Sequence, residues 1–169
     1  MLDIIYKRRS VREYQPNCVI AKEVYLELIK AGVMAPSARN GQPWSFICID
    51  DSEIIKELAE KVPMVNRFRD ASGFILVLLD LTKNPCPLAH QDLAAATQNI
   101  MLAATAMNIG TCWIGLKDTV GRIEVIKEVL NISDDYELFS MIAVGMPKND
   151  DAFHQVDRPI DELVKFNRG

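Results

Sequence analysis

The segment from Ala35 to Trp44, APSARNGQPW, concentrates side chains that can hydrogen-bond a flat polar ligand. Ser37, Asn40 and Gln42 offer donors and acceptors at close spacing. The two prolines and the glycine between them prevent a regular helix through the segment. An ordinary turn between a helix and a strand has the same composition, so the segment alone leaves both interpretations open.

A second cluster lies near the N-terminus, where Lys7 to Arg12 reads KRRSVR. Guanidinium groups match phosphate oxygens in shape and charge, and a serine adds a short hydrogen bond. The cluster therefore suits a phosphate clamp, for which a mononucleotide would supply the counter-charge. A solvated basic turn paired with acidic residues elsewhere is the alternative.

Composition limits the classes of function. With 49% hydrophobic and 25% charged residues, the chain resembles an ordinary globular domain, and its net charge of −4 argues against general affinity for nucleic acid or an anionic membrane. The four cysteines form no CxxC pair and only two histidines are present, so no zinc or iron–sulfur site is expected. With no signal peptide or membrane-spanning run recognisable, we expect a reduced, cytoplasmic protein.

Hydrophobic periodicity predicts helices alternating irregularly with about four buried strands. The expected helices are a short one from Leu2, then Ala21–Met34, Glu53–Lys61 with Ser52 as N-cap, His90–Asn108, and one capped by Asp118 or Thr119. The expected strands are Ser45–Ile49, Phe74–Leu81, Thr111–Leu116 and Leu138–Val144, with an irregular basic segment at Lys61–Ser72.

This pattern predicts one α+β or α/β domain of three layers over residues 1–169, since no linker or repeat divides the chain. The helix His90–Asn108 is apolar on almost every side, so it must be buried in the domain or against a second subunit. The tail over residues 150–169 is too short to fold alone and must dock on something. Neither a GxGxxG turn nor a Walker loop is present, so phosphate recognition would fall to the arginines.

Taken in order, RRSVR, APSARNGQPW and GTCWIG, the last at residues 110–115, resemble the FMN-dependent nitroreductase family, and the resemblance covers nearly the whole chain. It implies a three-layer α/β/α fold with a mostly antiparallel central sheet flanked by helices. It also implies bound FMN, NADH or NADPH as electron donor, and a homodimer with FMN at the subunit interface. The tail over residues 150–169 would then dock on the partner subunit.

The resemblance assigns site residues position by position. The flavin phosphate clamp would comprise Arg8, Ser10 and Arg12, with Arg9 contributing backbone and Arg158 completing the clamp. The loop that reaches the flavin from the neighbouring subunit would contain Pro36, Ser37, Ala38, Asn40 and Gln42. The flavin ring would lie along Cys112, Trp113, Ile114 and Gly115, with Asn66 facing its pyrimidine edge.

The implied activity is reduction of nitroaromatics, quinones or similar planar small molecules by a ping-pong mechanism. In such a mechanism the cofactor performs the chemistry, so no catalytic side chain is assigned. Arg67 and Arg69 either stabilise negative charge on reduced flavin or are simply solvated. Cys112 fits inert packing better than a redox role.

Two alternative functions stay open. The chain has few residues between Leu81 and His90, where larger relatives carry a lid, so the protein could bind flavin without rapid turnover, as a carrier or redox sensor. It could instead be a specialised reductase that removes halogen or reduces enones. Val156 stands where some relatives carry a second cation, so the clamp would have one charge fewer.

Overall fold

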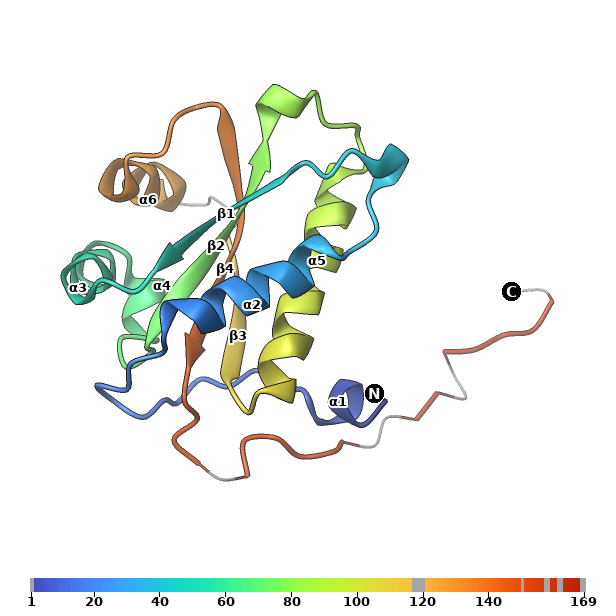
Figure 1. Cartoon of the computed structure of the whole chain (residues 1–169), viewed down its shortest axis with the longest axis horizontal. Coiled ribbons are helices and arrows are strands. Elements are labelled where there is room, and N and C mark those ends of the chain that lie inside the picture. The colour runs from blue at the N-terminus through green and yellow to red at the C-terminus, as the bar shows by residue number, and fades with distance from the viewer. Residues whose placement is uncertain (1, 117–120, 150, 157–158, 161–162, 168–169) are drawn as a thin grey trace.

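A four-stranded sheet forms the centre of the computed structural model, which describes residues 2–116, 121–149, 151–156, 159–160 and 163–167. The strands are β1 (Trp44–Ile49), β2 (Gly73–Asp80), β3 (Gly110–Gly115) and β4 (Tyr136–Gly145), in the order β1-β2-β4-β3 (Figure 1). Each neighbouring pair is antiparallel. The expected α+β class with a mostly antiparallel sheet is confirmed.

Strand β2 shows why the sheet is covered on both faces. All eight of its residues are buried, and the six from Phe74 to Leu79 alternate between two hydrophobic cores. Phe74, Leu76 and Leu78 belong to one core, whereas Ile75, Val77 and Leu79 belong to the other. This period of two follows from the pleat of a β-strand, and an uninterrupted apolar run is its signature in a sequence.

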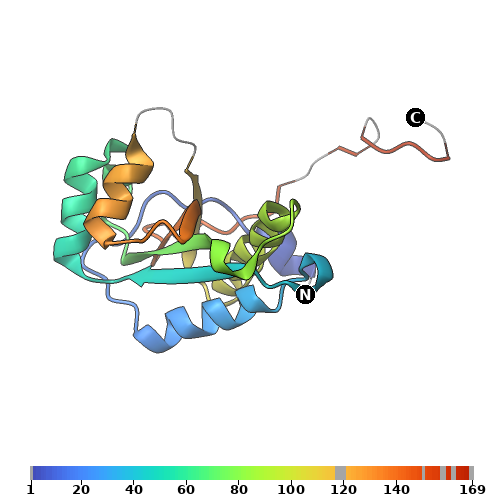
Figure 2. The same ribbon diagram turned by 90° about the horizontal axis from the view of Figure 1, so that it is seen from above.

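Helices form the two outer layers. On one face lie α2 (Lys22–Val33) and α5 (Ala89–Ala106). On the other face lie α3 (Ser52–Lys61), α4 (Pro63–Asn66) and α6 (Arg122–Leu130). Figure 2 shows α2 and α6 on opposite sides of the sheet. A short helix, α1 (Leu2–Lys7), precedes the sheet, and 3₁₀ turns occupy Ala38–Asn40 and Leu81–Lys83.

Helix α5 corresponds to the expected helix His90–Asn108, but it is not buried on every side. Leu93, Ile100 and Ala104 face the core with almost no exposure, whereas Ala94 and Leu102 are half-buried on another face. Its crossing with α2 is close, since a Cβ at Gly32 would lie 2.8 Å from Cγ1 of Ile100. The alanines of α5 therefore serve close packing, and part of the helix reaches the surface.

Two local expectations were wrong. Asp51, not Ser52, caps α3: its Oδ1 accepts hydrogen bonds from the backbone amides of Glu53 (2.8 Å) and Ile54 (3.2 Å). A carboxylate has two acceptor oxygens and also favours the positive end of the helix dipole. The segment expected to be irregular contains α4, which is held by the buried side chains of Val65 and Phe68. The expected caps Asp118 and Thr119 lie outside the described residues.

The described part of the C-terminal tail extends away from the domain without helix or strand (Figure 1). Ala152 and Phe153 are partly buried against the core, whereas Leu163 is 79% exposed and Phe166 is 85% exposed. None of the helices in the described ranges has both the length and the apolar character needed to cross a membrane.

Candidate functional site

The N-terminal arginine cluster lies along the outer edge of β3. Ser10 forms a parallel bridge with Thr111, and the amide of Val11 donates to the carbonyl oxygen of Thr111 at 2.9 Å. The chain then follows the end of β4, where the amide of Gln15 donates to the carbonyl oxygen of Met146 at 2.9 Å. The short polar motif is thereby fixed to the sheet rather than left as a loose turn.

Two glycines make room for this segment. Gly110 and Gly145 face each other across β3 and β4. A Cβ on Gly110 would lie 2.9 Å from Cγ1 of Val11, and one on Gly145 would lie 2.7 Å from Cδ1 of Tyr14. Val11 and Tyr14 are buried there, and burial raises the pKa of Tyr14 well above its usual range. These two side chains anchor the segment that carries the arginines.

Positive charge converges on Cys112 of β3. Burial raises the pKa of the Cys112 thiol, while the nearby charges of Arg12 and Arg67 and a hydrogen bond with the Ser10 side chain act in the opposite direction. Arg67 comes from the turn after α4, far from Arg12 in the sequence. The fold therefore brings together two basic segments, which favours binding of an anion beside β3.

The guanidinium of Arg9 adds donors that the sequence did not lead us to expect. Its Nη1 donates to the carbonyl oxygen of Arg8 at 2.6 Å, while Nε and Nη2 are buried and have no hydrogen-bond partner among the described residues. The cluster borders a hollow of about 340 Å³ that His154 also lines. Buried charged donors require an acceptor, so an anion would satisfy them.

The end of β3 is open at Gly115 among the residues that the structure describes. Ile114 is buried, and Trp113 is half-buried against Phe139, with ring centroids 5.9 Å apart. Gly115 is exposed, and a Cβ there would meet nothing within 4 Å. Packing within the chain thus leaves space beside Gly115 for a planar ligand.

The polar loop, residues 36–42, projects from the other end of the molecule. Pro36, Asn40 and Gln42 are exposed, whereas Ser37 and Ala38 are half-buried. The amide of Gln42 donates to Oγ of Ser37 at 3.1 Å, and its side-chain Nε2 donates to Oδ1 of Asn40 at 2.9 Å. The exposed groups can therefore contact a ligand or another chain.

Within one chain the polar loop and the arginine cluster are far apart. The amide of Ala38 contacts Asp92 in the first turn of α5, whereas Val11 packs on Gly110 just beyond the end of that helix. At 1.5 Å per residue, the 18 residues of α5 span roughly 27 Å. The two groups of expected site residues are thus placed at opposite ends of α5 (Figure 1).

Other expected residues have different positions. Asn66 and Arg69 line a cavity of about 730 Å³ that also borders residues 16–20 and α3. Arg69 lies 4.0 Å from the carboxylate of Asp70, with its side chain 69% exposed. Within the basic segment at residues 61–72, Arg67 is the residue whose charge acts to lower the pKa of Cys112. Arg158 lies outside the described residues.

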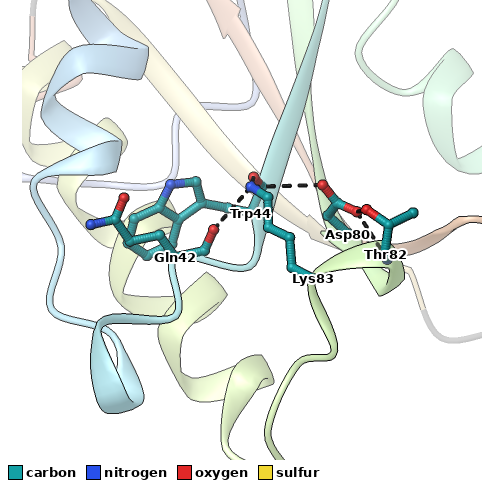
Figure 3. A network of polar contacts seen from close by, with 5 residues as sticks. All are labelled: Gln42, Trp44, Asp80, Thr82 and Lys83. Atoms are coloured by element: carbon teal, nitrogen blue, oxygen red, sulfur yellow. Dashed lines mark hydrogen bonds and ion pairs between the residues drawn. The ribbon is translucent and has the colours of Figure 1, made fainter.

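Two residues with a role in the loop were missed by sequence reasoning. Asp92 is the one acidic residue in the helix Ala89–Ala106, a signal that could have identified it. Lys83 donates to the carbonyl oxygens of Gln42 (3.1 Å) and Trp44 (3.4 Å), as Figure 3 shows. An exposed lysine after a strand carries no such signal, because most are simply solvated.

Fold and site define an α+β protein with arginines along the edge of β3 and a separate polar loop. The model of the Nitroreductase family matches residues 5–78 and 64–146. A protein of Archaeoglobus fulgidus with the provisional name NADH dehydrogenase/NAD(P)H nitroreductase is 36% identical over 158 residues, which cover 92% of this chain and 90% of that protein. The chain belongs to the Nitroreductase family.

Solved structures agree with this assignment. The crystal structure of a provisionally named NADH oxidase from Clostridium acetobutylicum has a TM-score of 0.88 at 32% identity, covering 98% of this chain and 99% of that one. A provisionally named nitroreductase from Desulfovibrio desulfuricans, crystallised with FMN, has a TM-score of 0.83 at 30% identity, covering 96% and 94%. These names agree with the expected nicotinamide donor and flavin cofactor.

Proposed function

We propose that this protein is a homodimeric, FMN-dependent oxidoreductase that uses NADH or NADPH to reduce nitroaromatics, quinones or similar planar acceptors by a ping-pong mechanism. Its relatives' names, which include an NAD(P)H nitroreductase and a structure in complex with FMN, support the class of cofactor and donor. The residues around β3 fit the cofactor. Arginines offer phosphate partners, and the space beside Gly115 admits a planar ring.

The proposal of a dimer rests on the separation of the arginine cluster and the polar loop along α5. In this proposal a single flavin does not reach both the arginine cluster and the polar loop of one chain, because they contact opposite ends of α5, a helix roughly 27 Å long. A two-fold dimer removes the conflict, since the loop of each subunit can complete the site of the other. The half-buried face of α5 and the exposed apolar tail supply surface for such an interface.

In this site Arg8, Ser10 and Arg12 hold the phosphate, and Arg9 adds its buried guanidinium donors. Residues 112–115 lie along the ring, and Pro36, Ser37, Ala38, Asn40 and Gln42 of the partner approach from the other side. We place Arg158 beside the phosphate and Asn66 at the pyrimidine edge.

FMN, when bound, supplies the hydride and electron transfer at its ring. The chain's own residues bind, orient and provide positive potential, and no side chain needs to act as nucleophile or general acid. Arg67, together with Arg12, is placed to stabilise negative charge next to Cys112. Cys112 itself packs in the core as a thiol, because burial raises its pKa and lowers its reactivity.

The decisive experiment is a visible spectrum of the purified protein, then anaerobic addition of NADPH or NADH and finally of a quinone. Flavin bands that bleach with a nicotinamide and return with the quinone support the proposal, and turnover above the free-flavin background excludes a carrier or sensor. Comparing quinones and nitroaromatics with enones and halogenated aromatics tests the specialised alternatives. A colourless protein that takes up no added FMN would contradict the proposal altogether.

A further inference from the structure

The polar loop, residues 36–42, has an unusual backbone conformation. Arg39, Asn40 and Gln42 have φ values of 55°, 55° and 45°, in the left-handed region that side chains other than glycine seldom adopt. Such a conformation costs free energy at each position and persists only where surrounding contacts determine it. The amides of Asn40 and Gln42 donate to Ser37 within the loop, and contacts from outside the loop add to this support.

Asp92 provides the first external contact. Its residue is only 7% exposed, and its Oδ1 accepts a hydrogen bond from the backbone amide of Ala38 at 3.0 Å. The other oxygen, Oδ2, is buried with no hydrogen-bond partner in the part of the chain that the structure describes. Burying a carboxylate is unfavourable unless hydrogen bonds compensate, and the bond that Asp92 accepts from the Ala38 amide provides part of that compensation.

Lys83 provides the second contact, at the other end of the loop (Figure 3). Its Nζ donates to the carbonyl oxygens of Gln42 and Trp44 at 3.1 and 3.4 Å. Asp80 orients this ammonium from 3.6 Å. Asp80 is in turn fixed by Thr82, whose hydroxyl and amide donate to Oδ1 at 2.6 and 3.1 Å.

We propose that Lys83 and Asp92 are positioning residues that preform the polar loop for the flavin site of the partner subunit. Neither residue needs to touch the cofactor, and each acts through the backbone of residues 38–44. The proposal rests on the proposed function. It states that two residues outside the expected site control the affinity for flavin in the opposite subunit.

The first test replaces Lys83 with methionine, which keeps the length of the side chain but removes the donors. We expect the Kd for FMN, measured by quenching of flavin fluorescence, to rise roughly three- to tenfold, because two hydrogen bonds from a charged donor are lost. Lys83→Arg should restore most of the affinity. Lys61→Met is the matched control, since Lys61 is 47% exposed, against 44% for Lys83, and also pairs with a carboxylate.

Asp92 is tested by Asp92→Asn and Asp92→Ala. The asparagine keeps an oxygen that can accept the Ala38 amide, whereas alanine leaves that amide without its partner. We expect the Asp92→Asn protein to bind FMN nearly as well as wild type does. The Asp92→Ala protein should bind FMN more weakly, while its rate of NADPH oxidation at saturating FMN stays unchanged. If Asp92→Ala fails to fold, the Lys83 variants alone decide the question.

Mixed dimers test whether Lys83 acts through the polar loop of its own subunit on the flavin site of the other subunit. Co-expression of Lys83→Met subunits with Arg12→Ala subunits, purified through two different tags, gives dimers in which one site has an intact clamp and an intact loop. We expect half of the sites to regain wild-type affinity. Mixing Lys83→Met with Asn40→Ala subunits, both altered in the loop, should restore none.

Wild-type affinity in Lys83→Met, or a failure of that variant to complement Arg12→Ala, would overturn the inference while leaving the proposed function intact. Absence of FMN binding by the wild-type protein would instead overturn the proposed function. The two failures are therefore distinguishable.

Discussion

Val11 occupies the space that a side chain at position 110 would need. A Cβ built on Gly110 would lie 2.9 Å from Cγ1 and 3.0 Å from Cβ of Val11. The two residues are 99 positions apart in the sequence, yet their contact sets the position of the arginine cluster against β3.

Replacing Gly110 with alanine should therefore both destabilise the domain and weaken flavin binding. Overpacking of this kind typically costs about 1 to 3 kcal/mol, and here relief requires Val11 and the attached arginines to move. Chemical denaturation and FMN titration measure the two effects. Gly115→Ala is the control, because nothing lies within 4 Å of its Cβ. It should leave the free energy of unfolding unchanged while hindering a ring that lies along β3. Equal loss of stability in both variants would contradict this account.

Replacing Arg12 with alanine should raise the Kd for FMN without unfolding the protein. Arg12 is exposed, and a charge-assisted hydrogen bond to phosphate contributes on the order of 1.5 to 3 kcal/mol. The measurement is flavin occupancy after purification followed by titration with FMN. Riboflavin, which lacks the phosphate, should bind wild type and variant equally. Lys30→Ala removes one exposed positive charge elsewhere and should have no effect. Full occupancy and unchanged affinity in Arg12→Ala would show that this motif is not the phosphate clamp.

The exposed tail should affect dimerisation and flavin binding only if a partner subunit covers it. Leu163 and Phe166 are 79% and 85% exposed, so changing both to serine removes almost no contact within the chain. We expect the double variant to dimerise more weakly in sedimentation velocity and to lose flavin on dilution, while its far-UV circular dichroism stays that of wild type. A double variant indistinguishable from wild type in all three measurements would separate the tail from the interface.

Asp80 should make stability depend on pH in the acidic range. Hydrogen bonds from Thr82 hold the pKa of Asp80 below its usual range. A carboxyl group whose folded pKa is depressed contributes stability above its unfolded pKa of about 3.9 and loses it as the pH falls through the lower folded value. Asp80→Asn should therefore be less stable than wild type at pH 7 by about 1 to 2 kcal/mol, and the difference should shrink below about pH 4. Denaturant titrations at pH 7, 5, 4 and 3 give this difference directly; a gap that persists at pH 3 would assign the effect to shape rather than charge.

The elements were largely predictable because their signals are local. Strand β2 is an uninterrupted apolar run, and α5 carries a long apolar pattern, so their bounds were correct to within a few residues. The contacts that make the site are not local. Val11 meets Gly110, Ala38 meets Asp92, and Ser10 meets Cys112 only because the sheet order places their segments together. In the proposed dimer, which loop and which arginine cluster share one cofactor depends on a second chain, and no hydrophobic pattern specifies that.

Helix α5 sets a distance as well as a layer of the fold. Asp92 near its start holds the polar loop, and Gly110 beyond its end receives the arginine segment. Inserting one residue between them would rotate one end against the other by about 100° and lengthen the helix by about 1.5 Å. In the proposed dimeric site, the length of α5 therefore fixes how far the polar loop lies from the arginine segment, whatever its individual residues contact.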